Sequence, residues 1–330
     1  CFRQLTSGRL SDTSMRAVFL DASTFSSSVT FEAIEKQVDS FITYPTTQSE
    51  NIIKRCLDAE LVITNKVVLT EPILQQLPKL QLICIAATGT NNVDLVAAKK
   101  LNIAVCNVAG YAKNSVAQYV FSQLLNYFQN ITHHNKNVEN GLWTKSDTFC
   151  VFGNDIHEIA GKTIGIIGYG ALGQSVAQIA SAFGMKVKIA ERPGAKSIRE
   201  GRETLESVVK TSDIISLHCP HTNETEQLVD KSFLSKMKKD AVLINTARGA
   251  LVKNEDLITA LKDNQIAHAI LDVIDQEPPP EDHPLLKKNF ENLTVTAHIA
   301  WASIEAQQEL IRLLSQNIYA YKTGSTLNRV

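Results

Sequence analysis

Three side chains that could together reduce a carbonyl group follow three apolar runs in the second half of the chain. Arg248 lies in LINTARGALV, Glu277 in LDVIDQEPPP and His298 in LTVTAHIAW. The planar fork of arginine can hold a carboxylate and reach a neighbouring carbonyl oxygen. A histidine can give a proton to a developing alkoxide, and a glutamate beside it would stabilise the imidazolium and orient the ring. The set would match a substrate with a carboxylate next to a carbonyl.

Each of these residues alone has a simpler structural explanation, such as a surface turn or a loop that stops a helix. Their shared position, each just after a predicted strand, favours the chemical reading because the ends of parallel strands meet at one edge of a sheet. Other histidines lack such neighbours. His133 and His134 are expected in a solvated loop, and HEIAG at His157 lacks the second histidine of a zinc site, so no metal is expected.

A cofactor is indicated by GYGALG, residues 168–173, which stands between an apolar run and a helical pattern. Such a turn can present backbone N–H groups and a positive helix end to a pyrophosphate. An acidic residue ends the next apolar run, where a carboxylate would meet the adenosine ribose. This favours NAD, although the adjacent Arg192 leaves NADP open. The residues expected at the cofactor are Gly168, Gly170, Ala171, Leu172, Gly173 and Glu191.

Alternating apolar runs and helical patterns would position these groups. In the first part, strands are predicted at 16–20, 60–65, 80–86 and 102–108, with a helical stretch at 91–101. A long amphipathic helix is predicted between Ala112 and Asn130. Six strands follow, at 163–168, 186–190, 213–219, 241–245, 268–273 and 293–297, with helices at 170–183, 203–211, 231–239 and 254–264. A last helix, at 304–321, is expected to return to the first domain.

Length and composition fit a small-molecule enzyme. The 330 residues suggest about two domains, and the net charge of -1 gives no reason to expect nucleic acid as a partner. Continuous apolar runs are too short for a membrane span, and scattered cysteines in apolar runs are typical of reduced, buried thiols. We therefore expect a cytoplasmic protein. Residues 1–14 are polar and aperiodic and are interpreted as an extension outside the fold.

From about Met15 to Tyr321 the chain resembles the D-isomer-specific 2-hydroxyacid dehydrogenase family, most closely its glycerate dehydrogenase (hydroxypyruvate reductase) branch. The resemblance rests on several separate motifs: ATGTNNVDL, NVAGYAKNSVAQ, GIIGYGALG, LHCPHTNET, INTARGALV, LDVIDQEPPP and TAHIAWAS. The sequence departs from the usual family pattern at Ala297, where proline commonly precedes the histidine, and at Glu191, where aspartate is more frequent.

The resemblance implies roles for individual residues. Arg248, Glu277 and His298 match the family's catalytic arginine, its acidic partner and its acid-base histidine. Arg248 and His298 are also expected to bind substrate, together with Thr88 and Gly89. Asp272 matches the aspartate that accepts a hydrogen bond from the nicotinamide amide. The other implied cofactor contacts are Cys219, Pro220, Thr225, Thr246 and Ala247. Tyr111, Trp143 and Trp301 are candidates to line the substrate pocket.

The resemblance also implies an α/β fold of two Rossmann-like, doubly wound parallel-sheet domains. The NAD-binding domain, 112–296, would be inserted into a discontinuous, flavodoxin-like substrate domain formed by 15–111 and 297–330, with the active site in the cleft between them. A homodimer is expected through the cofactor domain, because the segment from Ala112 to about Cys150 resembles the family's dimerising arm. Trp143 would project toward the partner.

The activity implied is hydride transfer between NAD(H) and a small 2-oxoacid, with hydroxypyruvate reduced to D-glycerate and glyoxylate as a second substrate. Two other functions stay open. One is formate or phosphite dehydrogenase activity on the same fold, although Glu277 beside His298 argues against formate, for which glutamine would be expected. The other is an NAD-sensing scaffold of the co-repressor kind, which would keep the same residues.

Overall fold

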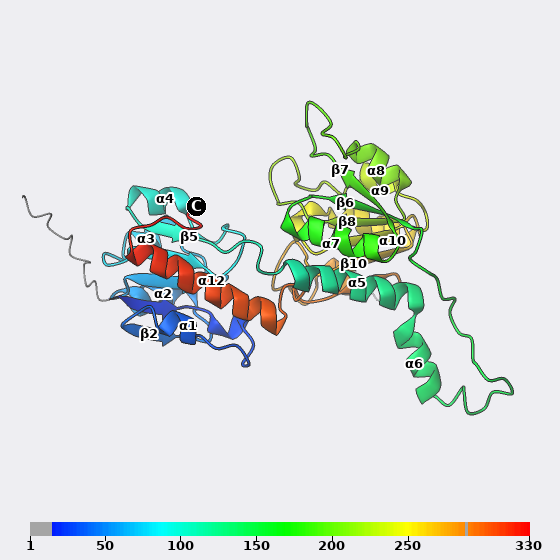
Figure 1. Ribbon diagram of the computed structural model, residues 1–330, viewed down its shortest axis with the longest axis horizontal. Coiled ribbons are helices and arrows are strands. Elements are labelled where there is room, and N and C mark those ends of the chain that lie inside the picture. Colours follow the sequence, from blue (N-terminus) through cyan, green and yellow to red (C-terminus); the bar gives the residue numbers. More distant parts are fainter. Residues whose placement is uncertain (1–14, 288–289) are drawn as a thin grey trace, which may run out of the picture. The chain divides into compact units, whose positions relative to one another are not determined.

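The computed structural model describes residues 15–287 and 290–330, and the predicted extension at 1–14 lies outside them. The described chain forms two compact units. Unit 1 comprises 15–112 and 302–330, and unit 2, Lys113–Trp301, is inserted between these segments. Each unit is built on one parallel sheet with helices (Figure 1). The predicted α/β class with an inserted domain is therefore confirmed.

Unit 1 contains a five-stranded parallel sheet of order β2-β1-β3-β4-β5. The strands are β1 (Arg16–Phe19), β2 (Ser40–Thr43), β3 (Leu61–Thr64), β4 (Leu82–Ile85) and β5 (Ala104–Cys106). The sequence predicted all but β2, an edge strand whose residues are partly or fully exposed. The helices between the strands are α1 (Glu32–Glu35), α2 (Ile52–Cys56), α3 (Glu71–Leu74) and α4 (Leu95–Lys100).

The last helix, α12 (Ile304–Lys322), packs in unit 1, as expected from the sequence (Figure 1). Ser303 caps its first turn by accepting a hydrogen bond from the Ala306 amide. The Gln307 side chain accepts from the Ser26 amide, and Asn317 donates to the carbonyl of Asn107. These bonds join the end of the chain to its beginning.

Unit 2 contains a six-stranded parallel sheet of order β11-β10-β9-β8-β6-β7. The strands are β6 (Thr163–Ile167), β7 (Lys186–Ala190), β8 (Ile214–Leu217), β9 (Val242–Asn245), β10 (His268–Leu271) and β11 (Leu293–Val295). The helices between the strands are α7 (Ala171–Ala182), α8 (Leu205–Thr211), α9 (Lys231–Lys236), α10 (Asn254–Lys262) and α11 (Pro284–Lys287). The strand order reverses at β6 and β8, where such folds bind ligands at the carboxyl ends of the strands.

Two helices precede this sheet: α5 (Lys113–Gln129), which was predicted, and α6 (Ile131–Glu139), which was not. Asn130 separates them in the left-handed conformation, at φ 50°. The expectation that His133 and His134 lie in a loop is wrong, since both are half-buried on α6. His133 bonds to Asn137 one turn later. The helix buries no residue fully and its sequence, ITHHNKNVE, is mostly polar, so no apolar run revealed it.

The described part of the chain has no helix long and apolar enough to span a membrane.

Acid should destabilise unit 2 through two buried histidines. Burial lowers the pKa of His218 and of His268 to about 4. Between pH 6.5 and pH 4 these histidines are protonated in the unfolded chain and neutral in the folded one. Their effect on stability is therefore absent above the unfolded pKa of about 6.5, and the free energy of unfolding decreases as the pH falls below that value. We expect each histidine to lower the free energy of unfolding by about 2 kcal/mol between pH 7 and pH 5. Urea unfolding at pH 7 and pH 5 measures this change. The loss of stability between the two pH values should be about 2 kcal/mol smaller for His268→Gln than for wild type, and unchanged for the exposed control His157→Gln.

Candidate active site

The glycine turn between β6 and α7 leaves space above it where a ligand could bind. A Cβ at Gly168, which has φ 95°, would lie 2.4 Å from the Cys219 nitrogen, and one at Gly173 would lie 2.1 Å from the Gly168 oxygen. Both glycines are thus required by close backbone packing. Gly170 differs, because a Cβ there would meet no described atom within 4 Å. It is the N-cap of α7, so the amides of the first helical turn, which have no partner within the helix, follow directly after it.

Replacing Gly170 tests whether that space receives phosphate. Its φ of -84° suits alanine, so Gly170→Ala should fold normally and keep the wild-type melting temperature. A methyl group in the phosphate position should nevertheless weaken NADH binding by roughly tenfold or more. Fluorescence titration with NADH measures this, and equal affinity in the two proteins would contradict the assignment. Gly173→Ala is the contrasting variant, because its clash is internal and should lower the melting temperature itself.

The segment after β8 is held beside this turn. The His218 amide donates to the carbonyl of Ile167, and Cys219 is buried, which raises the pKa of its thiol to about 11. Thr225 is buried and donates from Oγ1 to the carbonyl of Pro220 at 2.8 Å. Thr225 therefore fixes the shape of the loop that was expected to lie along the cofactor.

Arg248 follows β9 in a turn that its own strand organises. The Asn245 side chain accepts from the Ala247 amide and donates to the carbonyl of Arg248, at 3.0 and 2.8 Å. Arg248 is half-buried, and its Nη1 donates to the Ala247 carbonyl. The next residue, Gly249, packs so closely that a Cβ would lie 1.9 Å from the Ile274 carbonyl. The loops after β9 and β10 are consequently in backbone contact.

Glu277 and His298 form a direct pair at the ends of β10 and β11. Glu277 Oε2 lies 2.6 Å from His298 Nδ1, and Glu277 Oε1 accepts from the Ile274 amide at 3.1 Å. The side chains remain 33% and 23% exposed, so a small molecule can reach them. Because Nδ1 is bonded to the carboxylate, Nε2 is the ring atom left to exchange a proton with a ligand.

Asp272 supports the backbone on which His298 stands. His298 has φ 55°, a conformation that only glycine adopts without cost. The buried carboxylate of Asp272 accepts from the amides of Ile299 and Ala300, at 2.9 and 2.8 Å, and its carbonyl accepts from the His298 amide. Thr296 Oγ1 donates to the same carboxylate at 2.6 Å. Asp272 therefore positions the histidine.

Several residues that sequence reasoning missed hold this site together. Tyr119, on α5, shares a 2.6 Å hydrogen bond with Thr296. His283 is 3% exposed, and its Nε2 lies 2.8 Å from Asp275, which also accepts from Asn254. This second pair closes the loop that carries Glu277. The pairing of Asp275 with His283 could have been suspected from the sequence DQEPPPEDH, which begins and ends with these residues. The same sequence is also typical of a solvent-exposed loop, so it did not predict the pair.

Glu191, at the end of β7, is only 2% exposed. Its two oxygens accept from the Arg192 and Arg199 amides, and from the Arg199 guanidinium. The side-chain hydrogen bond from Arg199 holds the pKa of Glu191 well below its usual range. The carboxylate expected to meet the ribose is thus occupied by the protein's own cation.

The remaining predicted residues fall in both units. In unit 1, Thr88 follows β4, donates to the Val108 carbonyl and accepts from Asn107, which ties the segment with Gly89 to the end of β5. Tyr111, also in unit 1, is half-buried. In unit 2, Trp301 is half-buried, and Trp143 is 53% exposed with its indole donating to the Phe149 carbonyl.

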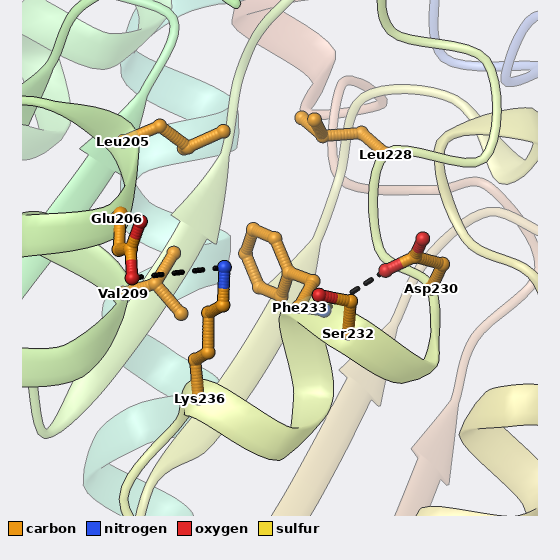
Figure 2. Close-up of a pocket in the computed structure, with 8 residues that line it drawn as sticks. All are labelled: Leu205, Glu206, Val209, Leu228, Asp230, Ser232, Phe233 and Lys236. Atoms are coloured by element: carbon orange, nitrogen blue, oxygen red, sulfur yellow. Dashed lines mark hydrogen bonds and ion pairs between the residues drawn. The ribbon is translucent and has the colours of Figure 1, made fainter.

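One pocket of unit 2 lies away from all these residues. It is bordered by α8 and α9, and Figure 2 shows Lys236 pointing toward Glu206 beside the Phe233 ring. Lys236 Nζ and Glu206 Oε1 are 3.7 Å apart. The lining residues are Leu205, Glu206, Val209, Leu228, Asp230, Ser232, Phe233 and Lys236. Since none of them was predicted to bind substrate or cofactor, the pocket is not the candidate active site.

The residues present fit a dinucleotide. The space at Gly170 suits a pyrophosphate, and the buried Thr246 Oγ1, after β9, has no hydrogen-bond partner within 15–287 and 290–330. A bound ligand could supply the missing partner, because buried polar groups are normally paired. Over the same described ranges, no cluster of three or more His, Cys, Asp or Glu side chains could hold a metal ion.

Comparisons with known proteins agree with this arrangement. Residues 121–300 match the family model described as D-isomer specific 2-hydroxyacid dehydrogenase, NAD binding domain. The chain is 41% identical over 318 residues to glycerate dehydrogenase of Methylorubrum extorquens, covering 96% of this chain and 98% of that one. It is 36% identical to hydroxypyruvate reductase of Blautia hydrogenotrophica, with 86% and 88% covered.

Among solved structures, an acyclic imino acid reductase (Bsp5), determined in complex with NADPH and D-Arg, matches with a TM-score of 0.81 at 30% identity. The match covers 96% of this chain and 100% of that one.

Proposed function

The chain belongs to the D-isomer-specific 2-hydroxyacid dehydrogenase family, and we propose that it reduces hydroxypyruvate to D-glycerate, with glyoxylate as a second substrate. Its NAD-binding domain makes it an NAD-dependent oxidoreductase of that family. The observation that carries the proposal is the 2.6 Å pair of His298 and Glu277, because Glu277 lies on the loop after β10, which is in backbone contact with the loop that bears Arg248. Glycerate dehydrogenase, hydroxypyruvate reductase and glyoxylate reductase relatives support the substrate class.

In this mechanism each residue has a distinct role. Arg248 would bind the substrate carboxylate and polarise the carbonyl, and Thr88 and Gly89 are proposed as further substrate-binding residues. His298 donates its Nε2 proton to the oxygen of the forming alkoxide and takes it back in the reverse direction. Glu277 holds the ring through Nδ1 and stabilises its charged form. The nicotinamide cofactor supplies or accepts the hydride.

The dinucleotide would be held by unit 2. The glycine turn with Ala171 and Leu172 would bind the pyrophosphate, while Thr246, Ala247 and the loop with Pro220 would lie along the cofactor. Asp272 would accept from the nicotinamide amide in addition to positioning His298.

A steady-state assay tests the proposed activity. Oxidation of NADH should be fastest with hydroxypyruvate, slower with glyoxylate and slowest with pyruvate. No turnover with any of these acids, together with tight NADH binding, would instead favour an NAD-sensing scaffold. Reduction of NAD by formate or phosphite, without turnover of the 2-oxoacids, would place the chain with another activity of this fold.

Assembly as a homodimer through the arm of unit 2 is also proposed. Exposed apolar side chains gather on the segment 131–156, and Phe149 and Phe152 are 91% and 88% exposed. Such a surface is typical of a protein interface. The others are Ile131, Val138, Leu142, Trp143 and Ile156.

Replacing both phenylalanines with serine should weaken the dimer. Phe149→Ser with Phe152→Ser removes apolar area from the interface, so we expect the mass measured by light scattering to fall toward 36.3 kDa as the sample is diluted. The exposed Leu57→Ser, in unit 1, is the control. A wild-type protein that is already a monomer at high concentration would refute the proposed assembly.

A further inference from the structure

The loop that carries Glu277 runs over the surface between two buried anchors. No residue from 275 to 282 is buried, whereas Ile274 before this stretch and His283 after it are 9% and 3% exposed. Packing against a core does not fix the shape of such a loop, so its conformation depends on the hydrogen bonds at its ends. Glu277 nevertheless lies 2.6 Å from His298 Nδ1.

His283 joins the two ends of this loop through both nitrogens of its ring. Nδ1 accepts from the Leu285 amide at 3.3 Å, in the first turn of α11, and Nε2 lies 2.8 Å from Asp275 Oδ1. Since Nδ1 is an acceptor, the ring proton is on Nε2, which donates to the carboxylate. One nitrogen therefore caps a helix, and the other links residue 283 to residue 275.

Asp275 receives this bond where three segments meet. The same oxygen accepts from Nδ2 of Asn254, the first residue of α10, at 2.6 Å. The Asp275 backbone packs on the turn after β9, since a Cβ at Gly249 would lie 2.3 Å from its nitrogen. Desolvation tends to raise the pKa of Asp275, but the hydrogen bonds from His283 and Asn254 outweigh it and lower the pKa. The acceptor is therefore charged near neutral pH, which strengthens the bond from His283.

The bond between His283 and Asp275 bears directly on the Glu277 carboxylate. Glu277 Oε1 accepts from the Ile274 amide at 3.1 Å, and Oε2 is the oxygen that meets His298. Ile274 and Asp275 are neighbours in the chain, so a displacement of Asp275 shifts the amide that holds Glu277. Without the bond from His283, the loop would sample more conformations, and the carboxylate would meet the imidazole for a smaller part of the time.

We propose that His283 is a positioning residue for the acid-base pair, and that it acts through Asp275 on the orientation of Glu277. A misaligned Glu277 would slow proton transfer from His298 and leave substrate binding unchanged. His283 itself is buried and bonded at both ring nitrogens, so it exchanges no proton with the substrate. The inference rests on the proposed function, in which His298 is the proton donor.

Two substitutions separate the two contacts of His283. His283→Gln places an amide N–H near the position of Nε2 and can still donate to Asp275, whereas His283→Asn places a carbonyl near Nδ1 and can still cap α11. We expect His283→Asn to lower the kcat for hydroxypyruvate by about tenfold, with KM and the Kd for NADH within about twofold of wild type. His283→Gln should keep kcat within about twofold of wild type. Equal kcat values for His283→Asn and wild type, or equal losses in the two variants, would overturn the proposal.

The matched control is His157→Asn, which removes an exposed histidine of the same unit and should leave kcat unchanged. Asp275→Ala approaches the same bond from its other end. It removes a side chain that is 49% exposed and leaves the buried ring in place, so it should fold even where a change at 283 does not. It should lower kcat as His283→Asn does, and a wild-type kcat in Asp275→Ala would contradict the inference.

A double-mutant cycle with Glu277 distinguishes positioning from a purely structural role. In a Glu277→Gln background, His283→Asn should change kcat by less than about twofold, because the carboxylate that it positions is already gone. An undiminished loss in that background would mean that His283 acts by another route, and the proposal would be wrong.

Hydrogen exchange followed by NMR examines the same bond without turnover. The Ile274 amide is bonded to Glu277 Oε1, so it should exchange at least about fivefold faster in His283→Asn than in wild type, and at the wild-type rate in His283→Gln. The Asp272 amide, bonded to the Asn245 carbonyl, is the internal reference. Faster exchange at Ile274 supports the inference even in a protein that reduces no 2-oxoacid. A hydroxypyruvate reductase in which His283→Asn changes neither this exchange nor kcat would keep its proposed function and lose this inference.

Discussion

His298→Ala should reduce the turnover of hydroxypyruvate by roughly 100- to 10,000-fold, which is the usual contribution of a positioned acid-base group. The imidazole is the proton donor in the proposed mechanism, and its Nδ1 is already engaged by Glu277. NADH affinity should stay within about twofold, because the residue acts on substrate. Stopped-flow measurement of NADH oxidation, with a separate NADH titration, gives both quantities.

The matched control for this variant is His157→Ala, which removes an exposed histidine of the same unit. It should retain the parent rate. If His298→Ala also reduced hydroxypyruvate at the parent rate, the histidine would not be the acid. If His298→Ala also lost NADH binding, we would conclude that His298 contacts the cofactor rather than the substrate.

Arg248→Ala should lower kcat/KM strongly, because a substrate carboxylate would lose its paired cation. Truncating one member of such a pair costs about 2 to 5 kcal/mol, which corresponds to roughly 30- to 5,000-fold. Arg248→Lys keeps the charge and loses the planar fork, so its loss should be intermediate. Initial rates over a range of hydroxypyruvate concentrations separate the effects on KM and kcat.

Arg312→Ala is the control, since it removes an exposed arginine on α12 and should leave both constants unchanged. A neutral substrate offers a second check. With an uncharged α-ketoamide the difference between Arg248→Ala and wild type should be much smaller than with hydroxypyruvate, because the contact with a carboxylate is absent from both reactions and only the polarisation of the carbonyl is left to lose. An undiminished difference with this substrate would mean that Arg248 does not act through the carboxylate.

The sequence predicted most of the fold because buried parallel strands leave a local signal. Runs such as LICI and VLIN are apolar throughout and bounded by helical patterns. The edge strand β2 lacks that signal, since its residues face solvent. Helix α6 was missed for the same reason, as its residues stay partly exposed and its start depends on the left-handed backbone of Asn130.

The sequence predicted which types of residue follow the strands of the candidate site, but not the contacts that these residues make with one another. The Glu277–His298 pair follows from two neighbouring strands, which the alternating pattern indicated. The bonds from Asp272 to the backbone around His298 depend on the turn geometry, which carries no periodicity. The pairing of Glu191 with Arg199 depends on an irregular loop. The roles of these residues in binding and catalysis stay predictions.

At position 298 the backbone conformation favours one residue and the proposed chemistry requires another. With φ at 55°, a side chain other than glycine typically costs about 1 to 2 kcal/mol there, and the bonds from Asp272 offset this cost. Glycine would therefore be the most stable residue at this position, but it has no side chain that could donate a proton. Screens that select only for thermal tolerance should tend to enrich glycine at 298 and yield sturdy, inactive proteins.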